Sequence, residues 1–397
     1  MLIALGWSMV SPSSAQFLDD FTGASLTVDP RGVEGWTFFT GDGKATMTFS
    51  ASATGYASIC VDASRDTRGI WWALIKRRVS QVLDLGLLRR RNHALRIEAR
   101  IRSSNAPRRV NLHLNTQRTK NFHMHLMEFD IPDTVQWHTI SMTTKDFDAV
   151  PGDSVYGQLA LMDWGSGRYR VDVDYFRVDI VQTDSAGPDQ GVQVPYHPTV
   201  PGAGSFRHHV PVEADAMADL QYPDMNFNNW GVQTDSGRVA LLTVSGTQFV
   251  LMRWDLGAYA GQKVMGSGVL ELTTHAVQRA PENAKDFGMV RVCEILGGAP
   301  QWDQSSVTYH TLCRGEPIDR VVNPQMIIDV DVSGKRGDKI FITISKPVLQ
   351  RMIDGTTSGL AIKPLGAVVA SFYSIENRKG EVSPKLHFTI DPHSVSR

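Results

Sequence analysis

Side chains suited to directed hydrogen bonding alternate with apolar ones in the N-terminal half of the chain. The segment 109–117 places Asn, His, Asn and Gln at every second position, with Val and Leu between them. Successive side chains of a β-strand point to opposite faces of its sheet, so this segment is expected to have one polar and one apolar face. The segments 95–102 and 122–129 alternate similarly, and consecutive strands often lie side by side. One sheet face would then collect Arg96, Glu98, Arg100, Arg102, Asn111, His113, Asn115, Gln117, His123 and His125.

These residue types fit the cleavage of an acidic polysaccharide by β-elimination. Such a lyase needs a group that neutralises the uronate carboxylate, a base for the C5 proton and an acid for the leaving oxygen. Arg, Asn or Gln suits the first role, and His or Tyr suits the other two. We expect catalytic roles for His113, His125, Tyr169 and Arg100, with Tyr169 chosen only because its strand lies nearby. Substrate binding is expected of Arg96, Asn111, Asn115, Gln117, His123, Trp71 and Lys76.

The local charge indicates the class of ligand. The whole chain has a formal net charge of -1. The segment from Lys76 to Lys120, however, contains thirteen Lys or Arg residues and only two acidic residues. A basic surface on a near-neutral protein favours an anionic partner. Acidic polysaccharide fits better than nucleic acid, because Arg binds carboxylates with paired hydrogen bonds and no motif of a nucleic-acid reader is present. We therefore expect an acidic glycan partner and no nucleic acid.

Other uses of the same residues remain open. The polar face could hold a glycan without cleaving it, or it could be an ordinary solvated face of a structural cell-surface protein. His123 and His125 have the spacing of two metal ligands on one strand, although no third ligand stands out. Hydrolysis is disfavoured because a glycosidase needs two facing carboxylates. The candidate strands offer only Glu98 and Glu128, on opposite faces.

The elements that position these residues are predicted to be strands throughout. Short alternating segments are broken by Gly, Pro, Asn or Asp about every ten residues, which is typical of a β-sandwich or jelly roll. Residues 182–206 are rich in Pro, Gly and Ser and are predicted to be a linker. The sequence thus predicts an all-β protein with two tandem β-sandwich domains, 17–181 and 207–391. A single short helix is expected at about 347–354.

The second half carries motifs that resemble the DNRLRE family, which includes carbohydrate-binding module family 96. The carrying residues are the segment 248–256 (QFVLMRWDL), the segment 301–309 (QWDQSSVTY) with Pro317, and the segment 348–386 with its Gly, Phe372 and Glu376 positions. Trp254 and Tyr309 replace the family's usual Phe and Trp. The resemblance implies a β-sandwich that accompanies enzymes of acidic polysaccharides, and it fixes no ligand.

The first half is more loosely similar to jelly-roll carbohydrate-binding modules and jelly-roll polysaccharide lyases. It opens with FLDDFTG at 17–23 and closes with VDVDYFRV at 171–178. The resemblance implies a structural calcium held by Asp174 with an acid of the opening segment, either Asp19 or Asp20. Carboxylate oxygens suit that cation. No organic cofactor is expected.

The first sixteen residues predict export. An apolar run, Leu2 to Val10, precedes small residues that form a plausible signal-peptidase site before Gln16. We therefore expect a secreted protein, extracellular or periplasmic. No run of about 18 apolar residues is present, so no membrane span is expected. Cys293 and Cys313 could pair in an oxidising compartment.

Overall fold

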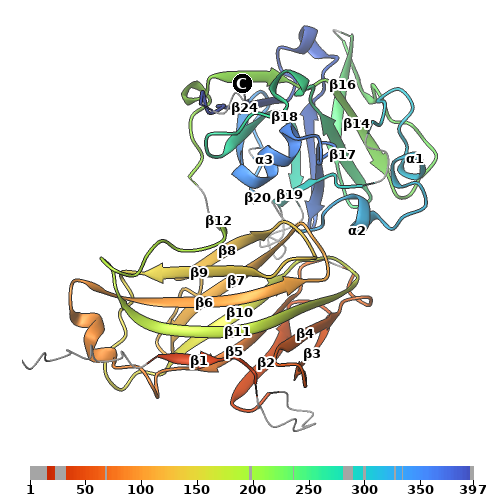
Figure 1. The fold of residues 1–397 in the computed structure, drawn as a ribbon. Helices are drawn as coiled ribbons and strands as arrows, with labels where there is room; N and C mark the ends of the chain where they lie inside the picture. The colour runs from red at the N-terminus through yellow and green to blue at the C-terminus, as the bar shows by residue number, and fades with distance from the viewer. Residues whose placement is uncertain are drawn as a thin grey trace, which may run out of the picture. The chain divides into compact units, whose positions relative to one another are not determined.

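The computed structural model describes residues 16–22, 33–67, 69–195, 199–235, 237–279, 289–297, 301–325, 328–332 and 334–393. It divides into two compact units, which we call the first and second domains (Figure 1). The first comprises the chain to Met162 and Arg168–Gln193, and the second comprises Asp163–Gly167 and the chain from Val194. The predicted signal peptide, 1–16, lies almost wholly outside the described residues.

Two sheets form the first domain. Its strands are β1 (Phe17–Asp19), β2 (Trp36–Gly41), β3 (Thr46–Ala51), β4 (Ala57–Asp62), β5 (Trp72–Arg78), β6 (His93–Ser103), β7 (Arg108–Thr116), β8 (Leu126–Ile131), β9 (His138–Thr144), β10 (Val155–Met162), β11 (Arg168–Gln182) and β12 (Val192–Val194). One sheet has the order β3-β4-β11-β6-β9, with β1 paired to β11. The other has the order β12-β8-β7-β10-β5-β2.

The apolar face of each sheet packs into the core of the first domain. Leu112 and Leu159 are directly opposite each other on β7 and β10, and both are fully buried. A Cβ added at Gly157 of β10 would lie 3.0 Å from the side chains of Phe176 and Val178 on β11. The two sheets therefore face each other closely enough at this point to favour a residue without a side chain.

Part of the predicted linker belongs structurally to the first domain. β12 pairs with β8, and the Arg96 guanidinium donates hydrogen bonds to the carbonyls of Ala186, Gly187 and Pro188 at 2.9–3.3 Å. The Pro and Gly residues of this segment prevent a regular strand or helix pattern. Its backbone carbonyls are nevertheless hydrogen-bonded to the first domain. The first domain therefore extends beyond the predicted range 17–181.

The second domain is also a pair of sheets. Its strands are β13 (His208–Pro211), β14 (Ala214–Asp219), β15 (Gly231–Thr234), β16 (Gly237–Val244), β17 (Gln248–Arg253), β18 (Gly268–Arg279), β19 (Met289–Glu294), β20 (Ile328–Val330), β21 (Lys339–Ile344), β22 (Leu360–Leu365), β23 (Val368–Tyr373) and β24 (Lys385–Phe388). One sheet has the order β13-β24-β18-β23-β16-β15, with β21 on β18, and the other has the order β14-β17-β22-β19-β20. The prediction of an all-β protein with two sandwich domains is confirmed.

In the described part of the second domain, three short α-helices interrupt the strands: α1 (Tyr309–Cys313), α2 (Ile318–Val321) and α3 (Lys346–Ile353). The predicted helix at 347–354 corresponds to α3, which has Pro347 in its first turn. α1 was not predicted, although Thr308 caps it by accepting a hydrogen bond from the Thr311 backbone N–H. Of the motif at 301–309, Trp302 is 3% exposed and lies in an apolar cluster with Cys293 and Cys313. Both cysteines are buried thiols.

No helix within the described ranges is long and apolar enough to cross a membrane.

Candidate functional site

The sheet assignment changes which polar residues share a face. β6 pairs with β11 and β9, whereas β7 pairs with β8 and β10 in the opposite sheet. The expectation that the segments 95–102 and 109–117 lie side by side is therefore wrong. In a sandwich, consecutive strands can cross from one sheet to the other, and alternation alone does not show whether they do. Arg96 and Arg100 thus lie on a different sheet from His113.

A polar face nevertheless exists, and it is built by β7, β10 and β5. We use the name polar face for Lys76, Asn111, His113, Asn115, Tyr156 and Gln158. Register places Tyr156 opposite Asn115 and Gln158 opposite His113, and Lys76 follows Gln158 on the next strand. These side chains point away from the core, because Leu112, Leu114 and Leu159 alternate with them and are buried on the core side.

The centre of the polar face is buried although it is on the outward side of its sheet. Asn111, His113 and Gln158 are 0%, 9% and 4% exposed. Within the part of the chain that the structure describes, Asn111 Oδ1, His113 Nε2 and Gln158 Nε2 are buried atoms without a hydrogen-bond partner. An unsatisfied buried polar group costs about 1–3 kcal/mol. Three of them on neighbouring positions of two paired strands are an unusual concentration, because buried polar atoms are nearly always paired.

Burial also fixes the charge state of His113. Desolvation, with a smaller contribution from the neighbouring His123, lowers the pKa of His113 from 6.5 to about 4. The imidazole is therefore neutral near pH 7, with one nitrogen as donor and the other as acceptor. A neutral imidazole beside two amides offers both donors and acceptors, which suits a ligand rich in hydroxyl groups.

One side of the polar face carries a cation and a phenol. The Lys76 ammonium lies 4.1 Å from the centroid of the Tyr156 ring. This cation–π contact draws the Lys76 side chain towards Tyr156 rather than out into solvent. Both side chains are partly exposed. They can therefore contact a ligand without the unfolding of any element.

Aromatic rings lie further along the same face. Trp72 on β5 and Phe39 on β2 have ring centroids 5.5 Å apart at an interplanar angle of 82°. Trp72 shares its face with Lys76 because the two are four positions apart on one strand. Its Nε1–H donates to Asp42 Oδ2 at 2.7 Å, and Phe39 is 42% exposed. An exposed ring held by such contacts offers an apolar surface of fixed orientation.

The opposite border of the polar face is closed by a buried ion pair. Glu128 of β8 lies opposite Asn111, and its Oε2 is 3.1 Å from Arg109 Nη1. The Asn111 amide Nδ2 donates to Met162 Sδ at 3.0 Å and more weakly to Glu128 Oε1 at 3.4 Å. These contacts use the amide nitrogen of Asn111, so its Oδ1 is the atom directed to a further donor.

Two residues predicted to contact substrate lie in the core instead. Trp71 is fully buried and stacks on Tyr169, with centroids 5.9 Å apart and an interplanar angle of 25°. The assignment of Trp71 as a platform and of Tyr169 as a catalytic group therefore fails on geometry. Neighbouring residues of a strand face opposite sides, so it is Trp72 rather than Trp71 that points outwards.

The predicted arginines have carboxylate partners on the other sheet. Arg100 Nη1 lies 2.7 Å from Asp174 Oδ2, and Arg96 Nη2 lies 3.5 Å from Glu98 Oε2. The basic surface expected there is thus largely neutralised by neighbouring acids. The structure does not bring Arg96 or Arg100 to the polar face.

The predicted calcium ligands also have protein partners. Asp174 binds Arg100 as described, and Asp20 Oδ1 accepts hydrogen bonds from the Thr22 backbone and hydroxyl. The pairing of Asp19 with Phe176 places the opening segment beside Asp174, as the resemblance implies. Among the described residues, no group of three or more His, Cys, Asp or Glu side chains could hold a metal. The calcium site stays a prediction.

The remaining predicted residues lie at one end of β7. Gln117 bridges Asp153 and the Ser154 backbone at 2.7 and 2.8 Å. The predicted strand 122–129 begins only at Leu126, so His123 lies in an exposed turn. His125 is buried in an edge-to-face contact with Phe147, at 5.0 Å between centroids, and burial lowers its pKa. His123 and His125 are thus not adjacent positions on one strand face, as a two-histidine metal site would need.

Three members or neighbours of the site were missed at the level of sequence: Tyr156, Gln158 and Phe39. Tyr156 and Gln158 alternate with apolar residues in the segment 155–162, so the same periodicity that identified His113 could have identified them. What the sequence does not show is that β10, far along the chain, is the strand beside β7.

Comparisons with known proteins give limited likenesses. No protein-family model matches the chain, the DNRLRE family included, and no curated protein matches it. A family 11 carbohydrate-binding module from Clostridium thermocellum, solved with a β-1,3-1,4-mixed-linked tetrasaccharide, is 15% identical. The match covers 42% of this chain and 96% of that one, with a TM-score of 0.27.

Two further solved structures are similar at the same level. The CBM22-1–CBM22-2 tandem domain of Paenibacillus barcinonensis Xyn10C is 12% identical, over 96% of this chain and 100% of that one, with a TM-score of 0.27. A carbohydrate esterase from Shiga toxin-encoding bacteriophage phi24B is 13% identical, over 43% and 99%, with a TM-score of 0.25. All these scores lie below 0.5.

Proposed function

We propose that this protein binds a polysaccharide through the polar face of its first domain. The observation that carries the proposal is a set of three buried atoms, Asn111 Oδ1, His113 Nε2 and Gln158 Nε2, which belong to residues at neighbouring positions of β7 and β10 and have no partner in the described part of the chain. Their unpaired state costs stability. A ligand whose hydroxyl groups both donate and accept would remove that cost on binding.

The surroundings of these three atoms favour a sugar over other polar ligands. A glycan presents hydroxyl groups at its ring edges and apolar C–H groups on its ring faces. The amides and the imidazole of the polar face can bond to the hydroxyl groups. The exposed Phe39 ring, which packs on Trp72, can contact the C–H groups. Small-molecule sites typically combine apolar or aromatic walls with a few placed polar groups. A secreted location, predicted from the N-terminal segment, would suit such a ligand.

Lys76 favours the acidic glycan that was expected from the sequence. It lies beside Gln158 and Tyr156 and has no carboxylate partner among the described residues. A uronate carboxylate could replace the Tyr156 ring as the partner of the ammonium and gain a stronger, charge-assisted hydrogen bond. An uncharged glycan would leave that ammonium in its cation–π contact.

A second candidate function is β-elimination at the same face. It is favoured by the proximity of a neutral imidazole, His113, to a phenol, Tyr156, with the amides of Asn115 and Gln158 between and beside them. His113 would take the C5 proton, Tyr156 would protonate the leaving oxygen, and Lys76 would neutralise the carboxylate. Tyr156 replaces Tyr169 in the role that the sequence assigned.

One experiment separates the two functions. The chain from Gln16 to Arg397 is incubated with alginate, glucuronan, pectate, ulvan and glycosaminoglycans, and with neutral xylan and mixed-linkage glucan. Affinity electrophoresis measures binding, and absorbance near 235 nm detects the unsaturated uronate that only β-elimination forms. If the glycan retards the protein in the gel and the absorbance stays constant, the protein is a binder. If the absorbance rises with the parent and does not rise with His113→Ala, it is a lyase. Absence of retardation and of absorbance on every glycan would contradict both.

A further inference from the structure

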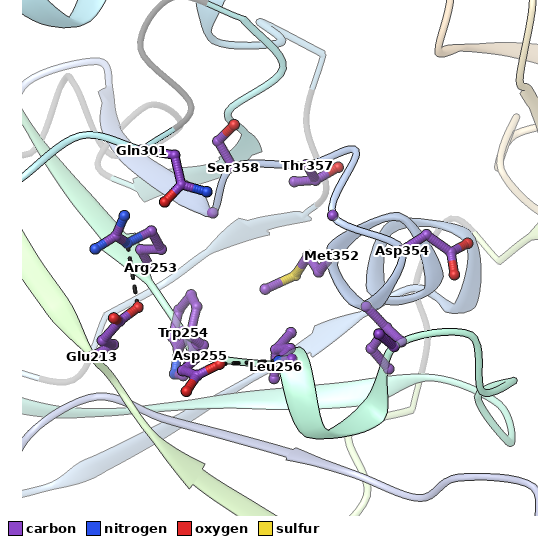
Figure 2. Close-up of a pocket in the computed structure, with 15 residues that line it drawn as sticks. Glu213, Arg253, Trp254, Asp255, Leu256, Gln301, Met352, Asp354, Thr357 and Ser358 are labelled. Carbon is purple, nitrogen blue, oxygen red and sulfur yellow. Dashed lines mark hydrogen bonds and ion pairs between the residues drawn. The ribbon is translucent and has the colours of Figure 1, made fainter.

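The second domain contains a pocket that the proposed function does not use. Its volume is about 400 Å³, near the lower end of the range of small-molecule sites, roughly 300–1,000 Å³. Most of the wall comes from the end of β17 with the turn that follows it, the C-terminal end of α3, and the loop that enters β22. Glu213, which precedes β14, and Gln301 complete the lining. Figure 2 shows the Arg253–Glu213 pair on one side and Asp354 on the opposite side, with Trp254 and Met352 between them.

Aromatic packing holds the Arg253 side of the pocket. The Arg253 guanidinium lies 5.5 Å from the centroid of the Trp302 ring, and its Nε is 3.4 Å from Glu213 Oε2. Trp254 is 6% exposed, and its indole Nε1 is a buried atom without a partner in the described ranges. The lining of the pocket therefore combines an ion pair, Arg253 with Glu213, and the indole of Trp254.

Carboxylates dominate the charge of the lining. The lining contains three carboxylates, Glu213, Asp255 and Asp354, and one cation, Arg253. Asp255 uses Oδ1 to accept from the Gly257 backbone N–H, and Asp354 uses Oδ1 to accept from the Gln350 side chain. The Oδ2 atoms of both aspartates retain acceptor capacity.

The position of Asp354 favours a role in binding over a role in stability. It caps the C-terminal end of α3, where the helix dipole is negative and a carboxylate is electrostatically unfavourable. Its carboxylate adds to the negative potential inside the pocket, which favours ligand groups that donate hydrogen bonds.

From this geometry we propose that the pocket binds the terminal sugar of a glycan chain, and that this sugar carries no carboxylate. Its hydroxyl groups donate to Asp255 and Asp354, and its ring face packs on the apolar wall that includes Trp254 and Met352. The excess of carboxylates repels a uronate. The limited volume admits the end of a chain rather than an internal stretch, in contrast to the polar face of the first domain.

The proposal does not depend on the function of the first domain. The full chain carrying Asn111→Leu/Gln158→Leu, which is expected to weaken binding at the polar face, is titrated by calorimetry with neutral disaccharides of glucose, xylose, mannose and galactose and with diuronates of equal length. We expect at least one neutral disaccharide to bind and the diuronates to bind more weakly. At equal mass of sugar, short saccharides should compete better than the polymer, because they present more chain ends.

Pocket variants test the roles of the two aspartates. The double variant Asp255→Asn/Asp354→Asn should lose about tenfold in affinity for the neutral disaccharide, because hydrogen bonds to charged groups are lost. It should gain affinity for the diuronate, and its unfolding midpoint should be unchanged or slightly higher. Asp184→Asn, an exposed acid of the first domain, is the matched control and should change neither affinity. The proposal is overturned if no neutral disaccharide binds, if diuronates bind better than neutral sugars, or if the double variant binds like its parent.

Discussion

His113 on β7 and Gln158 on β10 are directly opposite each other, and both are buried with an Nε2 atom that has no partner among the described residues. The neutral His113 imidazole could accept at Nε2 from the Gln158 amide, yet neither nitrogen forms a hydrogen bond with the other or with any other described residue. Stability alone therefore gives no reason for this pair. Binding of a ligand that supplies acceptors would give one.

If the pair serves binding, then removing its polar atoms should not harm the fold. We expect Gln158→Leu to leave the free energy of unfolding unchanged or to raise it by about 1 kcal/mol, because a buried unsatisfied amide is lost. Leu159→Ala, the neighbour that faces the core, should instead lower it by about 2–5 kcal/mol. Urea titration of both variants and the parent measures the difference. A large loss of stability in Gln158→Leu would mean that its amide is satisfied in solution.

The depressed pKa of His113 predicts how stability depends on pH. Above pH 6.5 the imidazole is neutral in both states, so this group contributes no pH dependence. As the pH falls from 6.5 towards 4, the unfolded chain takes up the proton first, and folding should lose up to about 3 kcal/mol. His113→Gln should flatten that part of the profile. Equal slopes for the parent and His113→Gln between pH 6.5 and 4 would show that His113 titrates normally.

The aromatic part of the site predicts a contrast between two exposed phenylalanines. Phe39 packs on Trp72 beside the polar face, whereas Phe122 is 57% exposed in the turn before β8. Phe39→Ala should weaken glycan binding by roughly three- to tenfold, on the scale of an aromatic contact of about 0.5–1.5 kcal/mol. Phe122→Ala should leave it within twofold. Affinity electrophoresis on the bound glycan gives both values, and equal losses would mean that the ring contact is not specific.

The second domain contains a carboxyl group that should be protonated at neutral pH. Burial, with the nearby charge of Glu376, raises the pKa of Asp215 from 3.8 to about 8, against one hydrogen bond from the Ile375 backbone. Between these pH values the unfolded chain loses the proton and the folded chain keeps it, so stability falls as the pH rises. Asp215→Asn mimics the protonated form and should raise the free energy of unfolding by roughly 2 kcal/mol or more at pH 8. This gain in the free energy of unfolding should vanish near pH 4. A gain of the same size at every pH would mean that the Asp215 carboxyl is not its cause.

Local periodicity was sufficient to predict the strands and the fold class. The alternation in 95–102 and 109–117 corresponds to β6 and β7, and the face that each presents to the core agrees with the expectation. The outward face of β7 supplied Asn111, His113 and Asn115 correctly as one set. These features depend only on the order of neighbouring residues.

Pairing between distant strands could not be predicted in the same way. The sequence placed β6 beside β7, but β7 lies beside β10, about 45 residues further along the chain, so Arg100 was included and Gln158 was missed. The hairpin-like spacing of β6 and β7 is compatible with one sheet or with a crossing between two sheets. Only the packing of the whole core decides between them. Trp71 and Trp72 were likewise indistinguishable until the register of β5 was known.

The most direct test of glycan binding by the polar face is a calorimetric titration of the best ligand from the polysaccharide screen. The parent chain is compared with Asn111→Leu/Gln158→Leu and with Arg100→Gln, which lies on the opposite sheet. The account predicts that the double variant remains folded and loses at least about tenfold in affinity, since two hydrogen bonds of about 1 kcal/mol each are removed. Arg100→Gln should bind like the parent. Full affinity in a folded double variant, or loss of affinity only in Arg100→Gln, would contradict the assignment of the site.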